Sequence, residues 1–298
     1  MRARLVLHGE QPNVQQHTAD RGPVFRSTDD WQLFEPAVNR LIRDNFSSSS
    51  ASEEAIAATV RVNTTAMSDR VREIIKLLGI TGDHRIGDFG CGYGLMPLLL
   101  HAATGARVEA FDRSESFLSV GRSFAAAHPE LAKGVSFARL DFVTESMPEG
   151  AGPYDTIILN NTLQYVVGTR NKLDVIRRLA SVLKPGGALM VYGPNPWYPR
   201  EPFTRLPMIH WLPRRMGNAL SLRLGRRQLF DIQYNTPLGL RRLVRRAGLE
   251  RVSYHPYGQE RVRVADGFLH AILAPVLCRY FAMVGRSPSR GTVSIGVS

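Results

Sequence analysis

The sequence predicts an α/β fold in which a mainly parallel, doubly wound sheet is covered by helices on both faces. From about residue 84 onward, short apolar runs typical of buried strands alternate with amphipathic helical stretches about every 25 residues. The chain has 298 residues, of which 44% are hydrophobic, so it is long enough to bury a full core around such a sheet. This composition excludes a disordered or collagen-like chain.

Two helices are expected before the sheet begins. In residues 31–45 apolar side chains recur at helical spacing, and a second helix is predicted from Ser68 to Leu78, where Gly79 would end it. The sheet region follows, with strands predicted at His84–Phe89, Arg107–Phe111, Val135–Leu140, Tyr154–Leu159 and Ala188–Tyr192, and helices at Tyr93–Ala103, Ser114–Ala127 and Lys172–Leu183.

The alternation stops after the fifth strand, for about forty residues without a regular period. It then resumes with a helix at Pro237–Ala247, a strand at Leu249–His255, a helix near Ala265–Leu277 and a last strand at Tyr280–Val284. The sequence contains no internal repeat that would indicate a solenoid or a propeller.

The net charge of +12 is distributed unevenly along the chain. Basic and acidic residues balance over residues 1–190, whereas residues 191–298 hold 17 arginines, no lysine and five acidic residues. Such an asymmetry indicates an anionic partner, which could be a nucleic acid, a membrane surface or an acidic substrate. Arginine-rich coding with solvated helix faces is the alternative explanation, and composition alone does not separate the two.

Cysteine usage and hydropathy set further bounds. Cys91 and Cys278 cannot build a disulfide scaffold, and the eight histidines are scattered singly, so no metal site is predicted. The longest apolar stretch, Phe268–Cys278, is much shorter than the roughly 20 residues that a membrane-spanning helix needs. The N-terminus lacks the apolar core of a signal peptide, so we expect a cytoplasmic protein.

The most specific chemical signal is a glycine-rich loop between the first strand and the following helix. It runs from Asp88 to Gly94 with the pattern D-x-G-x-G-x-G. Glycines here let the backbone turn sharply and approach a ligand, and the helix behind them offers unpaired N–H groups. The NAD fingerprint G-x-G-x-x-G is not met, because Leu95 stands three residues after Gly92.

Polar residues follow the next three strands at the points where these strands end. Asp112 comes 22 residues after Gly90, which is the spacing at which a carboxylate can accept the protons of two ribose hydroxyls. Asp141 follows the third strand, and Asn160 ends the fourth. Because parallel strands direct their carboxyl ends to one edge, these groups are expected to converge on a single ligand crevice.

Five ordered motifs over residues 66–256 carry a family resemblance: DFGCGYG, VEAFD, ARLDF, DTIILNNTLQYV and LKPGGALMVYG. They resemble those of class I methyltransferases that depend on S-adenosylmethionine (SAM). The resemblance implies a Rossmann-like sheet of seven strands with an antiparallel last strand, N-terminal helices and an insertion after the fifth strand. It also implies an N-terminal arm and helical extension at 1–65 and a methyltransferase domain at 66–298, in which 195–235 would form a lid over the acceptor.

The resemblance implies a role in SAM binding for nine residues. Asp88 would orient the amino group of the methionine part, although it could instead cap the following helix. Cys91 has no neighbouring histidine in the sequence, so packing is the alternative to any reactive role. Gly90, Cys91 and Gly92 would line the methionine part, Asp112 would hold the ribose, Asp141 would bind the adenine amino group, Phe142 and Arg113 would flank the adenine ring, and the carbonyl of Asn160 would reach the amino group.

The sequence offers only weak candidates for a catalytic base. Methyl transfer from a sulfonium needs positioning and exclusion of water, and a general base is needed when the acceptor is a hydroxyl. Many small-molecule members of the family have a histidine pair after the fourth strand, where this chain has Gln164 and Tyr165. Tyr165 and the lid residue His210 are the two candidates, and a structural role is the alternative for each.

The lid region indicates the kind of acceptor. Its aromatic residues and arginines favour a bulky, partly apolar or anionic acceptor, and they also suit peripheral contact with a membrane. The sequence therefore predicts a SAM-dependent methyltransferase acting on a small-molecule or lipid-like acceptor, with oxygen as the favoured atom. Two alternatives stay open: an RNA- or other nucleic-acid-binding protein or methyltransferase that uses the basic C-terminal third, and a catalytically silent cofactor-binding fold.

Overall fold

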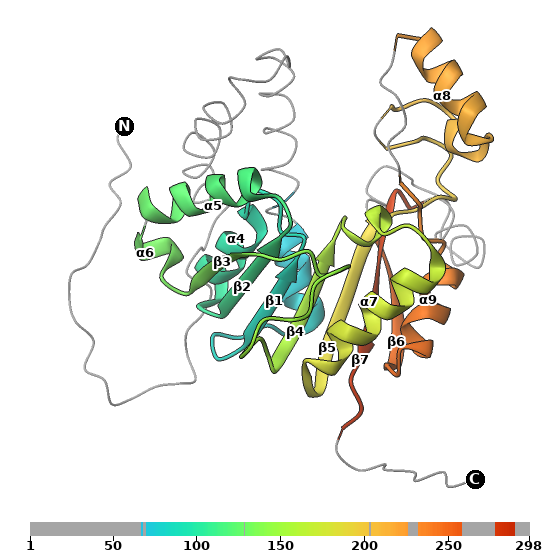
Figure 1. The fold of residues 1–298 in the computed structure, drawn as a ribbon. Coiled ribbons are helices and arrows are strands. Elements are labelled where there is room, and N and C mark those ends of the chain that lie inside the picture. The colour runs from blue at the N-terminus through green and yellow to red at the C-terminus, as the bar shows by residue number, and fades with distance from the viewer. Residues whose placement is uncertain are drawn as a thin grey trace, which may run out of the picture.

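The fold is a seven-stranded mixed sheet with the strand order β3-β2-β1-β4-β5-β7-β6 (Figure 1). Strand β7 runs antiparallel to both of its neighbours, β5 and β6, and the remaining pairs are parallel. The predicted α/β class and the antiparallel last strand are thus confirmed. This computed structural model describes Met67 and residues 70–127, 129–202, 204–225, 232–257 and 278–289.

The strands lie close to their predicted positions. Residues 70–78 are helical, as expected for the helix before the sheet. The strands are β1 Arg85–Phe89, β2 Arg107–Asp112, β3 Val135–Arg139, β4 Tyr154–Asn160, β5 Leu183–Pro194, β6 Glu250–Tyr257 and β7 Tyr280–Arg286. The helices are α4 Leu95–Thr104, α5 Glu115–Ala127, α6 Pro129–Ala132, α7 Thr169–Ser181, α8 Arg214–Arg223 and α9 Pro237–Arg246, with 3-10 turns η1 Leu163–Tyr165 and η2 Ile209–Trp211.

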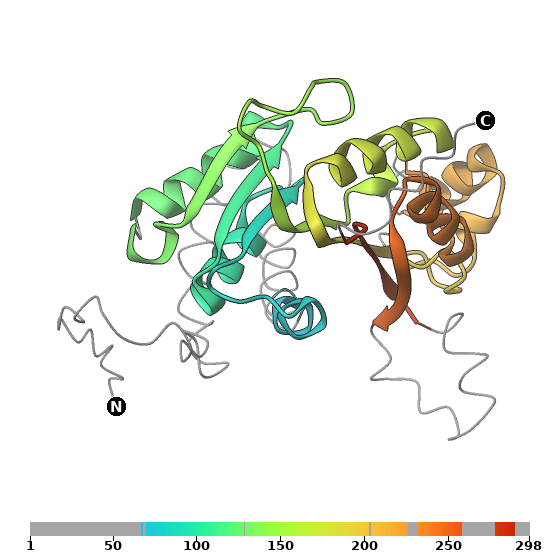
Figure 2. The ribbon, with the colours of Figure 1, turned by 90° about the horizontal axis from the view of Figure 1, so that it is seen from below.

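Side chains alternate between the two faces of the sheet and so build two cores. In β5, Met190 and Tyr192 join the core beneath residues 70–78, α4 and α5, whereas Leu189 and Val191 join the core beneath α7 and α9. Figure 2 shows the helix of residues 70–78 and α7 on opposite sides of the sheet. Both faces are therefore buried, which explains why the central strands read as nearly continuous apolar runs.

Strand register brings the predicted site residues to one edge. Phe89 pairs with Phe111 at the ends of β1 and β2, and Asn160 pairs with Tyr192 near the ends of β4 and β5. Asp112, the last residue of β2, pairs with Arg139 of β3. The carboxyl ends of these parallel strands form the edge at which open α/β sheets bind ligands.

Several predicted elements differ from the structure, and β5 begins at Leu183, five residues before the predicted start at Ala188. The helix expected from Tyr93 begins at Leu95, because Gly94 adopts a left-handed conformation at the N-cap. Residues 195–235, expected to be irregular, contain η2 and the ten-residue helix α8. The periodicity signal failed for α8 because small residues, Gly217 and Ser221, are the ones that this helix buries.

Several predictions concern residues outside the described part of the chain. These are the arm and helical extension at 1–65, including the helix at 31–45, and the helix near Ala265–Leu277. The division at residue 66 and the interpretation of 195–235 as an acceptor lid stay predictions.

Candidate cofactor site

The glycine loop adopts a conformation that only glycine accommodates easily. Gly90 has φ 81°, and a Cβ there would overlap the side chain of Thr162. Gly92 has φ 56°, but a Cβ there would meet no atom within 4 Å. Gly90 therefore allows two segments of the protein to approach each other, whereas Gly92 faces open space that a ligand can occupy.

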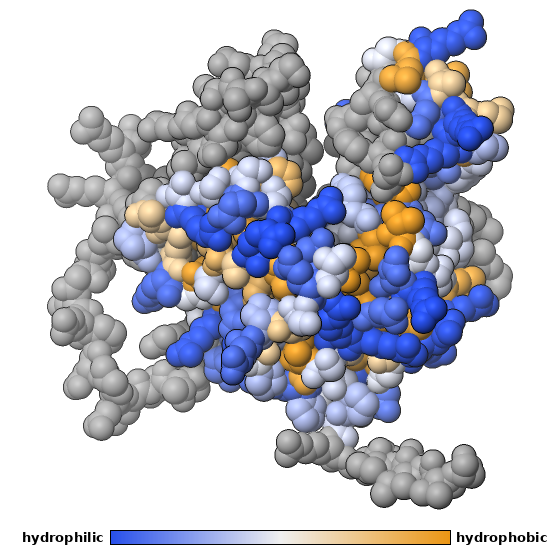
Figure 3. Space-filling view, viewed as in Figure 1, coloured by the Kyte–Doolittle hydropathy of each residue, from blue (hydrophilic) through white to orange (hydrophobic). Residues whose placement is uncertain are grey.

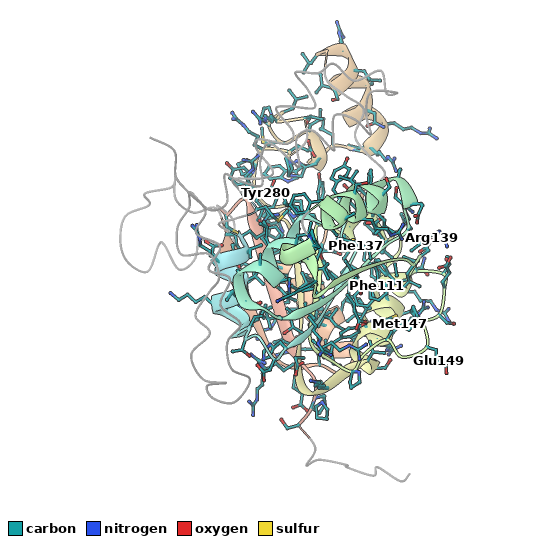
Figure 4. The ribbon with its side chains drawn as sticks, turned by 90° about the vertical axis from the view of Figure 1, so that its left-hand side faces the viewer. Phe111, Phe137, Arg139, Met147, Glu149 and Tyr280 are labelled. Atoms are coloured by element: carbon teal, nitrogen blue, oxygen red, sulfur yellow. The ribbon has the colours of Figure 1, made fainter. Side chains whose placement is uncertain are left out.

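Gly94 has a packing role rather than a place against a ligand. A side chain at Gly94 would overlap the ring of Phe137 on β3, which also lies against Gly121 of α5. Figure 4 labels Phe137 beside the helices that cover this end of the sheet. The third glycine of the motif thus serves the contact between the loop and β3, and its spacing from Gly92 carries no separate information about a ligand.

Backbone hydrogen bonds tie the loop to the end of β2. The N–H groups of Gly90 and Cys91 both donate to the carbonyl of Phe111, at 2.7 and 3.0 Å. The N–H of Gly92 donates to Oδ2 of Asp112 at 2.9 Å, and the N–H of Ser114 donates to its Oδ1 at 2.9 Å. Each carboxylate oxygen keeps a free lone pair after these bonds, so Asp112 can still accept hydroxyl protons from a ligand.

Asp88 is a buried carboxylic acid without a hydrogen-bond partner. Its side chain is 1% exposed, and neither carboxylate oxygen has a partner among the described residues. Burial, together with the charge of Asp112, raises the pKa of Asp88 to about 7. Because a buried, unpaired carboxylate is costly, this geometry excludes a helix-capping role and is suited to receive a cationic ligand group.

Thr162 connects the glycine loop to the end of β4 and was missed in the sequence. Its hydroxyl lies 3.2 Å from the carbonyl of Gly90 and 3.0 Å from that of Asn160. The Asn160 side chain in turn accepts a 3.2 Å hydrogen bond from Arg70, whose guanidinium lies 4.3 Å from the ring centroid of Tyr192. This chain of contacts fixes the Asn160 carbonyl, which was predicted to reach the cofactor amino group.

The three residues predicted to contact the adenine, Arg113, Asp141 and Phe142, lie in different surroundings. Oδ1 of Asp141 accepts a 3.1 Å hydrogen bond from the N–H of Val143, and this carboxylate is half-buried. Arg113 is exposed. The Phe142 ring is buried and packs edge-on against Phe89, with centroids 5.9 Å apart. That placement gives no support to the prediction that the ring of Phe142 flanks an adenine.

Cys91 has the properties of a packed, neutral thiol. Burial is the main cause that raises its pKa above the ordinary range, and the charges of Asp88 and Asp112 act in the same direction. Because the thiolate is the reactive form of cysteine, the geometry does not favour a nucleophilic role.

The two candidates for a catalytic base lie in different surroundings. Tyr165, in η1 after β4, is 47% exposed, and burial of part of the ring raises the pKa of its phenol. Nε2 of His210 lies 3.0 Å from the carbonyl oxygen of Pro196, so this nitrogen carries the proton. Nδ1 of His210 is buried without a partner among the described residues. Neither nitrogen of His210 is therefore presented to an acceptor in this conformation.

The described residues contain neither a metal centre nor a membrane-spanning helix. No group of three or more histidine, cysteine, aspartate or glutamate side chains there could hold a metal ion. Within the same residues, no helix has the length and apolarity needed to cross a membrane.

Residues 86–187 match a family described as "Methyltransferase domain". This range runs from β1 into β5 and includes the glycine loop and the ends of β2, β3 and β4. The match shows that residues 86–187 of this chain form a methyltransferase domain, and the fold around them is the one found in class I SAM-dependent methyltransferases. The recognition made from the five sequence motifs is thus confirmed.

Curated relatives have related names. A "Ubiquinone biosynthesis O-methyltransferase" of Marinobacter nauticus is 33% identical over 125 residues, which cover 41% of this chain and 48% of the relative. A "Ubiquinone/menaquinone biosynthesis C-methyltransferase UbiE" of Acidiphilium cryptum is 29% identical over 194 residues, covering 61% and 73%. The chain spans about half the length of the first of these relatives.

Solved structures share the fold at low sequence identity. The methyltransferase SibL in its apo form has a TM-score of 0.55 at 17% identity, covering 83% of this chain and 62% of that one. CcbJ from Streptomyces caelestis has a TM-score of 0.53 at 20% identity, covering 74% and 90%. The [4+2]-cyclase SpnF has a TM-score of 0.54 at 16% identity, covering 90% and 99%. Because these neighbours include a cyclase, the fold alone does not define the reaction.

Proposed function

We propose that this protein transfers the methyl group of SAM to a small-molecule or lipid-like acceptor, with oxygen as the accepting atom. The observation that carries the proposal is Asp88, whose buried carboxylate beneath the glycine loop has no hydrogen-bond partner in the part of the chain that the structure describes. SAM has a cationic amino group, which would supply the missing partner. The open space at Gly92 and the anchored carboxylate of Asp112 lie in the same loop region and fit the rest of such a ligand.

Each residue contributes to binding and orientation rather than to bond making. Asp88 would pair with the ammonium of the methionine part, and Asp112 would accept the ribose hydroxyls while its own position stays fixed by Gly92. When bound, SAM supplies an electrophilic methyl group on its sulfonium. The protein would bind the acceptor beside that methyl group and exclude water, and a hydroxyl acceptor would give up its proton to a general base, for which Tyr165 is the exposed candidate.

The acceptor class rests on two kinds of support. Relatives named for ubiquinone biosynthesis are similar to 41% and 61% of this chain, and both an O- and a C-methyltransferase are among them. Residues 195–235, which follow the carboxyl end of β5, combine aromatic and basic residues suited to a partly apolar acceptor. Oxygen is our choice because the chain has no asparagine-proline motif directly after β4 of the kind expected for amino-group acceptors.

Cofactor binding is tested first, by calorimetry with S-adenosylhomocysteine, the stable demethylated product of SAM. Asp112→Ala should reduce affinity by at least about a hundredfold, because it removes a charged acceptor of two hydroxyl hydrogen bonds. The matched control is Asp174→Ala on α7, an exposed aspartate whose Oδ1 lies 3.9 Å from Arg177, and it should bind normally. Equal binding by Asp112→Ala and wild type would refute the site.

Transfer is tested separately with methyl-labelled SAM and fractionated cell extract. Label in the lipid-soluble or small-molecule fraction that depends on the protein supports the proposal. Label in RNA would instead favour the nucleic-acid alternative. Cofactor binding without label in any fraction would favour a fold that binds the cofactor and is catalytically silent.

A further inference from the structure

Helix α8 exposes its large apolar side chains and buries its small ones. Met216, Leu220 and Leu224 follow one another at four-residue spacing and are 59%, 41% and 54% exposed. This spacing places them along one side of the helix. The residues that α8 buries are Gly217 and Ser221. A helix folded only to complete the core would have the opposite distribution.

The neighbouring turn η2 extends this exposed apolar surface. α8 packs against η2, where Trp211 is 53% exposed. Its indole N–H donates to the carbonyl of Pro196 at 2.7 Å, so the ring has a fixed position. Met208, just before η2, is also exposed. We define the α8 surface as Met208, Trp211, Met216, Leu220 and Leu224 together with the exposed arginines Arg205, Arg215 and Arg223.

The segment that carries this surface is almost purely basic. Residues 195–225 contain five arginines and a single acidic residue, Glu201. Glu201 is buried, and its carboxylate accepts hydrogen bonds from the hydroxyls of Thr204 at 2.7 Å and Tyr234 at 2.6 Å. No acidic side chain in this segment is therefore available to neutralise the arginines at the surface. Figure 3 shows hydrophilic and hydrophobic side chains next to each other over α8.

This combination discriminates among the possible occupants of the surface. A second copy of the chain, related by two-fold symmetry, would bring the same arginines together without acidic partners. A nucleic acid would match the charge but would leave the side chains of Met216 and Leu220 without an apolar environment. An anionic bilayer matches both properties, because apolar side chains enter the acyl boundary while arginines contact phosphate headgroups.

We propose that the α8 surface binds the face of an anionic lipid membrane peripherally. α8 lies beyond the carboxyl edge of the sheet, on the side where the strands end (Figure 1). Tyr280, which pairs with Pro194 at the end of β5, marks the same end of the sheet in Figure 4. A membrane held by α8 would therefore lie on the cofactor side of the molecule. The idea that this placement gives the enzyme access to a lipid-like acceptor rests on the proposed function. Membrane binding by the α8 surface does not.

The test is co-sedimentation of the full chain with vesicles of phosphatidylcholine alone or with about 30% phosphatidylglycerol, a content that creates a negative surface potential. We expect binding to the anionic vesicles that weakens as salt is raised. Met216→Ser should weaken it about tenfold, since one apolar side chain is lost from the bilayer. Leu238→Ser on α9 is the matched control, because Leu238 is 58% exposed, and it should leave binding unchanged.

The charge component is tested with a second matched pair of variants. Arg215→Gln with Arg223→Gln should weaken vesicle binding about thirtyfold, at roughly fivefold for each arginine near an anionic surface. Arg241→Gln with Arg242→Gln, an exposed pair on α9, removes the same charge and should change binding less than about threefold. All four residues are exposed, so unchanged thermal midpoints will show that the variants are folded.

Contact at η2 can be observed directly. Brominated lipids should quench tryptophan fluorescence in the wild type, and Trp211→Phe should remove that quenching. Absent vesicle binding, or an equal loss in the α8 and α9 variants, would overturn the proposal. A dimer in light scattering that Met216→Ser dissociates would overturn it in favour of a second copy. S-adenosylhomocysteine affinity measured on the same samples keeps the two proposals separate, because failure of cofactor binding with intact vesicle binding contradicts only the proposed function.

Discussion

The unpaired carboxylate of Asp88 makes a quantitative prediction about how cofactor binding depends on pH. In the ligand-free protein its pKa is about 7, raised from 3.8 mainly by burial. A cationic amino group pairs only with the ionised form, so the observed affinity should follow the ionised fraction of Asp88. That fraction is about one-tenth at pH 6 and about three-quarters at pH 7.5, so the affinity for S-adenosylhomocysteine should rise about eightfold over this range.

Calorimetry in buffers of different ionisation enthalpy measures the linked proton directly. At pH 6.5 binding should release about three-quarters of a proton, the share of Asp88 that is still protonated. Asp88→Asn should bind S-adenosylhomocysteine much more weakly, its affinity should not change with pH over this range, and residue 88 should release no proton. The range ends at pH 7.5 because an α-amino group itself begins to lose its proton near pH 8. Affinity that does not change with pH, or an identical pH dependence in Asp88→Asn, would refute this reasoning.

The raised pKa of Asp88 also predicts how the stability of the protein without cofactor depends on pH. Because the folded-state pKa of Asp88 is raised, its contribution is fully present below pH 3.8 and is lost as pH rises through about 7. The loss is on the order of 4 kcal/mol of unfolding free energy. Urea titrations should therefore show that saturating S-adenosylhomocysteine stabilises the protein more at pH 7.5 than at pH 6 at equal ligand concentration.

Three further predictions follow from other contacts. Gly90→Ala should lower the free energy of unfolding by about 1–3 kcal/mol and weaken cofactor binding in calorimetry, because the new methyl group meets Thr162. The control is Gly150→Ala, which has a similar φ but places its methyl group more than 4 Å from any atom, and it should retain binding. Burial lowers the pKa of Lys172 to about 8, so the free energy of unfolding should rise between pH 8 and 10 in urea titrations. An equal rise in Lys172→Met would contradict the assignment of this pH dependence to Lys172. Cys91 should react with a disulfide reagent at pH 8 at least about a hundredfold more slowly than free cysteine, and rapid labelling would show that its thiol is not held neutral.

Predictions that depend on local pattern agree well with the structure. The strands from β1 to β4 and the helix α9 were predicted to within a residue or two, because the periodicity of buried strands and amphipathic helices is visible in neighbouring residues. α8 was missed for the corresponding reason, since its exposed Met216 and Leu220 give no core-facing stripe. The ends of β1, β2 and β4 were also recognised, because their polar residues interrupt apolar runs.

The sequence by itself determined the fold class, the family and the strand ends at which a cofactor would bind. Only the tertiary structure decided how those residues are used: Thr162 meets the carbonyl of Gly90 across 72 positions of sequence, Asp88 has no hydrogen-bond partner among the described residues, and His210 contacts the carbonyl of Pro196. The physical reason is that periodicity and spacing are local properties of the chain. Hydrogen-bond partners, burial and the pKa values that depend on them arise from contacts between distant segments.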